Sequence, residues 1–260
     1  HSPQRRDERG WAGLFAPVDV AGIVFFRFVF AGVILGFVWT CFQQGWISLF
    51  YITPPYHPDF YGFGWIKPWP GDGMYIHFAV LGVAAAMVFV GLWYRLASVV
   101  VFLAFTQLTL IDRTLFQNHH YLMSLISFLM IFVPAHRACS IDALIKPHLR
   151  SDVAPAWALW ILRFQVGIPY IFGGIAKLNS DWLHGWPLRM WLRQRTDFPL
   201  IGQYFTEEWC IYFFTYAGLI FDLTVVPLLL WRRTRTFAFL AVLAFNVTNA
   251  ELFDIDVFPW

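Results

Sequence analysis

The stretch Tyr170–Gly185, YIFGGIAKLNSDWLHG, closes a long apolar run that begins near Ala156. It carries Lys177 at the point where apolar residues give way to polar ones. Because burial disfavours the charged form of an amine, a lysine at such a boundary can act as a base near neutral pH. The structural alternative is a lysine whose stem lies in hydrocarbon and whose ammonium reaches the interface, marking the edge of a membrane span.

The composition around this stretch is that of an integral membrane protein. Of 260 residues, 59% are hydrophobic, 20% are aromatic and only 13% are charged. A water-soluble chain with 14 Trp and 29 Phe residues would have too little polar surface to stay dissolved. The lipid bilayer is therefore the first expected partner. A net charge of +2, without a basic patch interleaved with aromatic residues, indicates no nucleic-acid partner.

The cysteines and the two ends of the sequence bear on disulfides, metal sites and the extent of the protein. Cys41, Cys139 and Cys210 stand apart from one another, so the sequence predicts neither a disulfide framework nor a metal site. The sequence begins at His1 and stops at Trp260 beside an apolar segment. We therefore expect it to be part of a longer protein, with a further C-terminal region.

Seven apolar segments have nearly the length of a membrane span, at 18–42, 76–94, 96–111, 119–134, 155–177, 208–231 and 236–253. A helix of about 20 apolar residues crosses the hydrocarbon core and satisfies its own backbone polar groups. The predicted fold is an all-α, polytopic transmembrane helix bundle with about seven spans, in a single domain over residues 1–260. Residues 43–75, rich in Pro, Gly, Tyr and Trp, are expected to form an ordered loop.

The distribution of arginines predicts how the bundle is oriented. A cytoplasmic N-terminus places the polar segment 1–17 inside, together with the basic residues near 95, 137, 150 and 232–235. The loop 43–75 is then extracytoplasmic. Polar residues from three segments reach the outer face, namely Asn118, His119, His120, Lys177, Asn249 and Glu251. We expect them to converge in one outward-facing site, although each alone could be an interfacial residue satisfied by water.

A second polar layer lies deeper in the apolar segments. Arg27, Arg163 and Asp222 each fall eight or nine residues from the cytoplasmic end of their segment, about 12–14 Å into the membrane. Charges in hydrocarbon are costly unless paired. We therefore predict an ion cluster of these three residues that holds the first, fifth and sixth segments together.

Several stretches carry a resemblance to a known family. They are FFRFVFAG (Phe25–Gly32), LWYRLAS (Leu92–Ser98), DRTLFQNHHYL (Asp112–Leu122), YIFGGIAKLNSDWLHG (Tyr170–Gly185), FDLT (Phe221–Thr224) and FNVTNAELFDIDVF (Phe245–Phe258). With these stretches in family order, the chain resembles the transmembrane domain of the vitamin K-dependent gamma-glutamyl carboxylases, the HTTM family, in a bacterial-type form.

The resemblance implies an activity and roles for particular residues. It implies that Lys177 is the base for reduced vitamin K, a hydroquinone of the menaquinol type, and that Asn118 and His119 belong to the same site. His120, Asn246 and Asn249 are further candidate quinone-binding residues. The family reaction uses oxygen to form the quinone epoxide and adds carbon dioxide to a glutamate of a secreted protein; no metal is implied. The expected location is a bacterial inner membrane, with the active site on the extracytoplasmic face.

The chain departs from the family pattern at two positions and leaves other functions open. Ala176 stands where the family usually has the first of two lysines, and Asn246 stands where a histidine is expected. One alternative is a membrane quinone-binding oxidoreductase that epoxidises without carboxylating peptides. A second is a non-enzymatic bundle of the sporulation-delaying type. A third is a haem protein with His77 and His119 as ligands.

Overall fold

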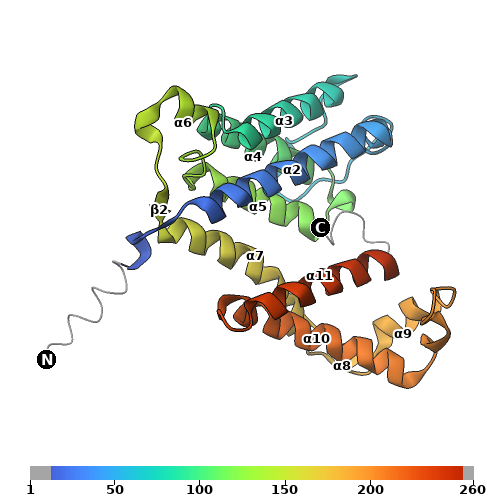
Figure 1. The fold of residues 1–260 in the computed structure, drawn as a ribbon. Coiled ribbons are helices and arrows are strands. Elements are labelled where there is room, and N and C mark those ends of the chain that lie inside the picture. Colours follow the sequence, from blue (N-terminus) through green and yellow to red (C-terminus); the bar gives the residue numbers. More distant parts are fainter. Residues whose placement is uncertain (1–12, 254–260) are drawn as a thin grey trace, which may run out of the picture. The chain divides into compact units, whose positions relative to one another are not determined.

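The structure, a computed structural model, describes residues 13–253 (Figure 1). Its long helices are α2 (Ala21–Gln43), α3 (Gly73–Val90), α4 (Tyr94–Ile111), α5 (Asn118–Phe132), α7 (Ala156–Ala176), α10 (Glu208–Leu230) and α11 (Arg235–Leu252). The shorter helices are α6 (Ile141–Ile145), α8 (Ser180–Leu183) and α9 (Trp186–Arg193), and single helical turns occur at Ser48–Ile52, Arg113–Leu115, Pro147–Leu149 and Gly202–Tyr204. The strands β1 (Pro17–Asp19) and β2 (Val153–Pro155) pair antiparallel, with Val18 opposite Ala154.

The predicted helical, membrane-type fold is confirmed. Each predicted apolar segment contains one long helix, and α2, α3, α4, α7 and α10 are the five helices in the described part of the chain that are long and apolar enough to cross a membrane. Helix α5 has only 15 residues, and α11 carries polar residues such as Asn246 and Glu251 along its 18. The span count of seven and the cytoplasmic N-terminus stay predictions.

The described residues form two compact units that meet between Gln165 and Val166, within α7. Each unit is described by itself below. In the first, α2 packs against α3, α3 against α4, and α4 against α5 (Figure 1). Ile34, Phe78 and Met130 are fully buried there. Between apolar helices, close packing of such side chains supplies the dispersion contacts that hold a bundle together in lipid.

Polar contacts hold the loop between α2 and α3 to the end of α4. The buried His57 and Asp112 pair through Nδ1 and Oδ2 at 3.0 Å. The amide and hydroxyl of Thr114 donate to the other oxygen of Asp112 at 2.7 and 2.6 Å. Burial raises the pKa of Asp112, but the hydrogen bonds from Thr114 and His57 outweigh it and hold this pKa below its ordinary value.

Arg27 is fully buried in the first unit, where backbone oxygens are its hydrogen-bond partners. Its guanidinium donates to the backbone oxygens of Ala135 at 2.5 Å, Ala138 at 3.3 Å and Cys139 at 2.6 Å. These oxygens belong to the turn after α5, where irregular backbone leaves carbonyls without helical partners. A guanidinium with five donors can satisfy this turn directly. The predicted pairing of Arg27 with Asp222 joins residues of the two units and stays a prediction.

We expect Arg27→Ala to destabilise the protein strongly. The substitution leaves buried carbonyls without donors, and each unsatisfied group costs about 1–3 kcal/mol. Thermal unfolding of the purified protein in detergent checks this, with the exposed Arg232→Ala as the matched control. Equal melting temperatures for Arg27→Ala and the control would show that Arg27 does not hold the turn.

The second unit is built on α8–α11. Helix α9 packs against α8 and α10, and α10 packs against α11 (Figure 1). Leu192, Phe205 and Ile211 are fully buried in its core. Arg195 donates to the backbone oxygens of Leu252 at 3.2 Å and Glu251 at 2.6 Å, which satisfies carbonyls at the end of α11.

Candidate functional site

The sequence around Lys177 folds as a break between two helices. Helix α7 ends at Ala176 and α8 begins at Ser180. Asn179 links both ends, since its side-chain nitrogen donates to the oxygen of Ala176 at 2.7 Å and its oxygen accepts from the amide of Trp182 at 2.9 Å. The Lys177 amine is thereby placed at the end of a long apolar helix, as the sequence predicted.

Lys177 forms an ion pair with Asp222 of α10. The side chain of Lys177 is 20% exposed and that of Asp222 is 8% exposed, so the pair is largely shielded from solvent. The Nζ atom of Lys177 also lies 4.9 Å from the centre of the Trp182 ring. Trp182 is itself fixed, because its indole nitrogen donates to the oxygen of Thr215 at 3.1 Å. The amine is thus held between a carboxylate and an aromatic face.

Glycines in α7 allow the close approach that this pair requires. A Cβ atom built on Gly173 would lie 3.3 Å from Oδ2 of Asp222. A Cβ atom on Gly174 would lie 2.6 Å from Cδ2 and 3.2 Å from the backbone nitrogen of Leu223. Small residues at such positions let two helices pack with their backbones near each other. The glycine pair therefore brings Asp222 level with the last turn of α7.

We expect Gly174→Ala to weaken the second unit. The added methyl group overlaps Leu223 and forces α7 and α10 apart, at a cost of about 1–3 kcal/mol. Thermal unfolding in detergent measures the loss. Gly36→Ala is the matched control, because Gly36 lies in helix α2 and a Cβ atom there meets nothing within 4 Å. A melting temperature for Gly174→Ala at or above that of Gly36→Ala would contradict the close-approach argument.

Aromatic and amide side chains lie near Asp222 in the same unit. The ring of Tyr170 lies 6.1 Å from that of Phe221, which stacks on Phe245 with centroids 4.0 Å apart. The side chain of Asn246 and the carboxylate of Asp222 both lie near the Tyr170 hydroxyl. Flat apolar faces and a few polar groups in one place are typical of sites for ring-shaped small molecules.

The carboxylate changes what we expected of the amine. From the sequence, burial alone was expected to keep Lys177 neutral. The structure adds Asp222 in direct contact, so the amine does not lie in purely apolar surroundings. In such a pair the Lys177 amine can donate to a hydroxyl group and the Asp222 carboxylate can accept from one.

The other predicted site residues are divided between the two units. Asn118 is exposed at the start of α5, and His119 lies beside His120 with ring centroids 4.5 Å apart. His120 packs between Phe37 and Phe105, with centroids 5.3 and 5.9 Å away. These residues belong to the first unit, and Lys177 belongs to the second. Their predicted convergence stays a prediction.

Two further predicted site residues lie on α11 in the second unit. Asn246 lies near the Tyr170 hydroxyl. Asn249 lies one turn nearer the end of α11, where its backbone oxygen accepts from the amide of Phe253 at 2.9 Å. Of these two residues, Asn246 is the one joined to the neighbourhood of the ion pair.

The ion cluster predicted from Arg27, Arg163 and Asp222 joins residues of both units and stays a prediction, and each of the three has contacts within its own unit. Asp222 has Lys177 as its ion-pair partner, and Arg27 bonds to backbone oxygens. The guanidinium of Arg163 lies 5.2 Å from the centre of the Trp160 ring.

Sequence reasoning missed the residues that shape the site, namely Tyr170, Gly173, Gly174, Trp182 and Phe245. A signal was present, because the glycine pair lies one helical turn before Lys177.

Comparison with known families adds to this geometry. The HTTM domain matches residues 15–260, which is nearly the whole chain. No solved structure matches the chain.

Proposed function

The chain belongs to the HTTM family, whose domain is found in gamma-carboxylase-related proteins, and we propose that it is a quinol-dependent membrane enzyme of the carboxylase type. The observation that carries the proposal is the shielded Lys177–Asp222 pair under the Trp182 ring. Its substrates would be a reduced quinone of the vitamin K type, oxygen, carbon dioxide and a glutamate of a secreted protein.

The residues present fit an aromatic diol. Trp182 and Phe245 offer flat faces for a ring, and the ion pair offers a donor and an acceptor for a ring hydroxyl. Asn246 adds amide groups that can donate and accept hydrogen bonds beside Tyr170. When bound, the quinol supplies the oxygen chemistry that leads to the epoxide and to proton removal from glutamate.

The protein's own part is proton transfer at a fixed position. Lys177 accepts the proton of a ring hydroxyl at Nζ when the amine is neutral. The ammonium so formed pairs with the carboxylate of Asp222. The carboxylate therefore stabilises the charge that develops as the proton moves. Shielding of the pair strengthens this interaction and excludes water that would consume a reactive species.

A second candidate function follows from Asn246. An amide cannot titrate, whereas the carboxylase resemblance calls for a histidine at this position. The alternative is an enzyme that epoxidises the quinone without carboxylating a peptide.

One experiment tests the proposal and separates it from this alternative. The full-length protein, purified in detergent, receives reduced vitamin K, oxygen and bicarbonate together with a glutamate-containing pentapeptide. Epoxide is measured by chromatography and carbon dioxide fixation by a radiolabel. Epoxide with fixation supports the carboxylase, and epoxide without fixation supports the second candidate. Absence of both from folded protein would overturn both candidates and favour a non-enzymatic bundle.

A further inference from the structure

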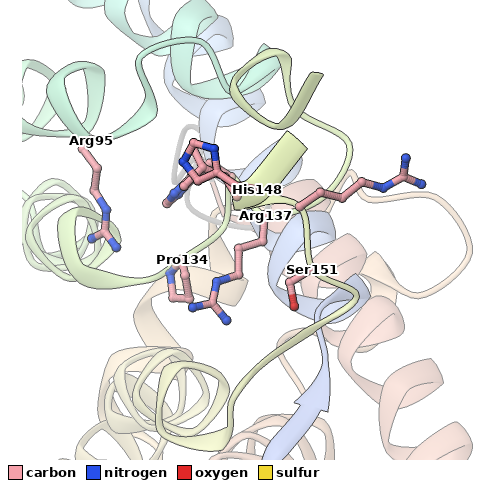
Figure 2. Close-up of a pocket in the computed structure, with 8 residues that line it drawn as sticks. Arg95, Pro134, Arg137, His148 and Ser151 are labelled. Carbon is pink, nitrogen blue, oxygen red and sulfur yellow. The ribbon is translucent and has the colours of Figure 1, made fainter. Parts of the chain in front are cut away.

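A cavity of about 320 Å³ lies in the first unit, and its lining includes none of the residues around Lys177 (Figure 2). It is bordered by the start of α4 and by the segment between α5 and α7. Its charged and polar lining residues are Arg95, His136, Arg137, His148, Arg150 and Ser151. Figure 2 shows Arg95, Arg137, His148 and Ser151 arranged around the hollow. A volume of this size is at the lower end of those that hold small molecules.

The lining is cationic. Among the residues that the structure describes around this cavity are three arginines and two histidines, and no carboxylate. The nearby Asp142 is occupied elsewhere, since its oxygens accept from the amides of Trp93 and Tyr94, both at 2.9 Å. A cavity lined by cationic hydrogen-bond donors and by no carboxylate is suited to bind an anion.

Two of the arginines are each held in place by one hydrogen bond to a backbone oxygen. Arg95 donates to the oxygen of Ile131, and Arg137 donates to the oxygen of Val153 at 3.1 Å. A guanidinium has five N–H donors, so each keeps others for a ligand. Because these contacts fix the side chains beforehand, binding an anion would cost little ordering.

His136 provides an independent sign that a partner is missing. Its ring stacks on Tyr94 with centroids 5.1 Å apart, and its buried Nδ1 has no hydrogen-bond partner among the described residues. Burial lowers the pKa of His136, and the guanidinium of Arg95 lowers it further. The ring is then neutral at pH 7, and one of its nitrogens carries a proton that it can donate.

We propose that this cavity binds a phosphate group, either on the headgroup of an anionic phospholipid or as a free phosphate. Guanidinium groups match the oxygens of phosphate in pairs, and His136 adds a neutral donor. The position favours a headgroup, because the cavity lies where α4 begins and α5 ends. Under the predicted orientation this is the cytoplasmic surface, where anionic lipids attract basic residues.

Scattered basic residues at a membrane edge would explain part of this pattern without any site. A site differs from them because it is concave and binds one ligand at defined residues. The test therefore compares two pairs of arginines. Arg137→Gln with Arg150→Gln removes two charges from the cavity lining, and the exposed pair Arg232→Gln with Arg233→Gln removes the same charge elsewhere.

The experiment measures retention of phosphatidylglycerol and of phosphatidylcholine by the full-length protein in detergent, using native mass spectrometry. Melting temperature is followed in parallel with inorganic phosphate and with sodium chloride at equal ionic strength. We expect one retained phosphatidylglycerol, bound about tenfold or more weakly after the cavity substitutions and unchanged after the control substitutions.

Protection by inorganic phosphate alone, lost in the cavity variant, would also support the site and would identify a soluble phosphate as its ligand. Equal effects of the two arginine pairs, or equal retention of both lipids, would overturn the proposal. Unchanged phosphate and phosphatidylglycerol binding in the cavity variant would also overturn it. The readouts do not involve quinol turnover, so they stand apart from the proposed function.

Discussion

Lys177→Ala is expected to reduce epoxide formation from reduced vitamin K by about a hundredfold or more, which is the usual loss when a general base is removed. Lys177 is the only lysine in the described part of the second unit, so no neighbouring lysine can take its place beside Asp222. Chromatography of the epoxide at saturating quinol measures the effect. Lys146→Ala, at an exposed position, serves as the control and should keep wild-type activity.

Loss of folding has to be separated from loss of the base. Lys177→Ala leaves Asp222 shielded without its partner, and we expect a lower melting temperature as well. The rate is therefore measured at a temperature where the variant remains folded by circular dichroism. Activity of folded Lys177→Ala at the level of Lys146→Ala would remove Lys177 from the chemistry and leave it a lysine at the membrane edge.

Asp222→Asn is expected to have the second largest effect. An asparagine of the same shape removes the negative charge that receives the ammonium, so we expect a loss of about tenfold or more in the maximal epoxide rate.

Asp181→Asn is the matched control, because Asp181 is exposed and lies only four residues after Lys177. We expect its epoxide rate to equal that of the wild type. A rate in folded Asp222→Asn equal to that of Asp181→Asn would contradict a role of the Asp222 charge in proton transfer.

Much of the fold could be predicted because apolar segments of membrane length leave few choices. Helices occur in every predicted segment, and Lys177 follows the end of α7 as expected. The weaker points were α5, which has 15 residues, and α11, whose polar residues lower its apolarity. Hydropathy alone does not decide whether such helices cross the membrane.

The partners of the buried charges could not be predicted from depth. The prediction placed Asp222 level with Arg163 by counting from the helix ends. In the structure Asp222 lies beside Gly173. Gly173 is 17 residues past the start of α7, about 26 Å along it, whereas Asp222 is 8 residues, about 12 Å, before the end of α10. Contacts between side chains set the offset of the two helices, and sequence spacing does not contain it.

Arg27 illustrates the same limit. Its partners are backbone oxygens of the turn after α5, and a carbonyl has no sequence signature. An isolated arginine in an apolar helix predicts that a partner exists, without showing whether it is a carboxylate or a turn.

The measurement that tests the central claim most directly compares epoxide formation by the wild type and by Lys177→Arg. An arginine keeps the positive charge and can still pair with Asp222, but its guanidinium does not give up its proton. The full-length proteins are purified in detergent, matched for folding, and given reduced vitamin K and oxygen. We predict oxygen-dependent epoxide from the wild type and only background from Lys177→Arg. Equal epoxide from both, or none from folded wild-type protein, would contradict the assignment of Lys177 as the base of a quinol site.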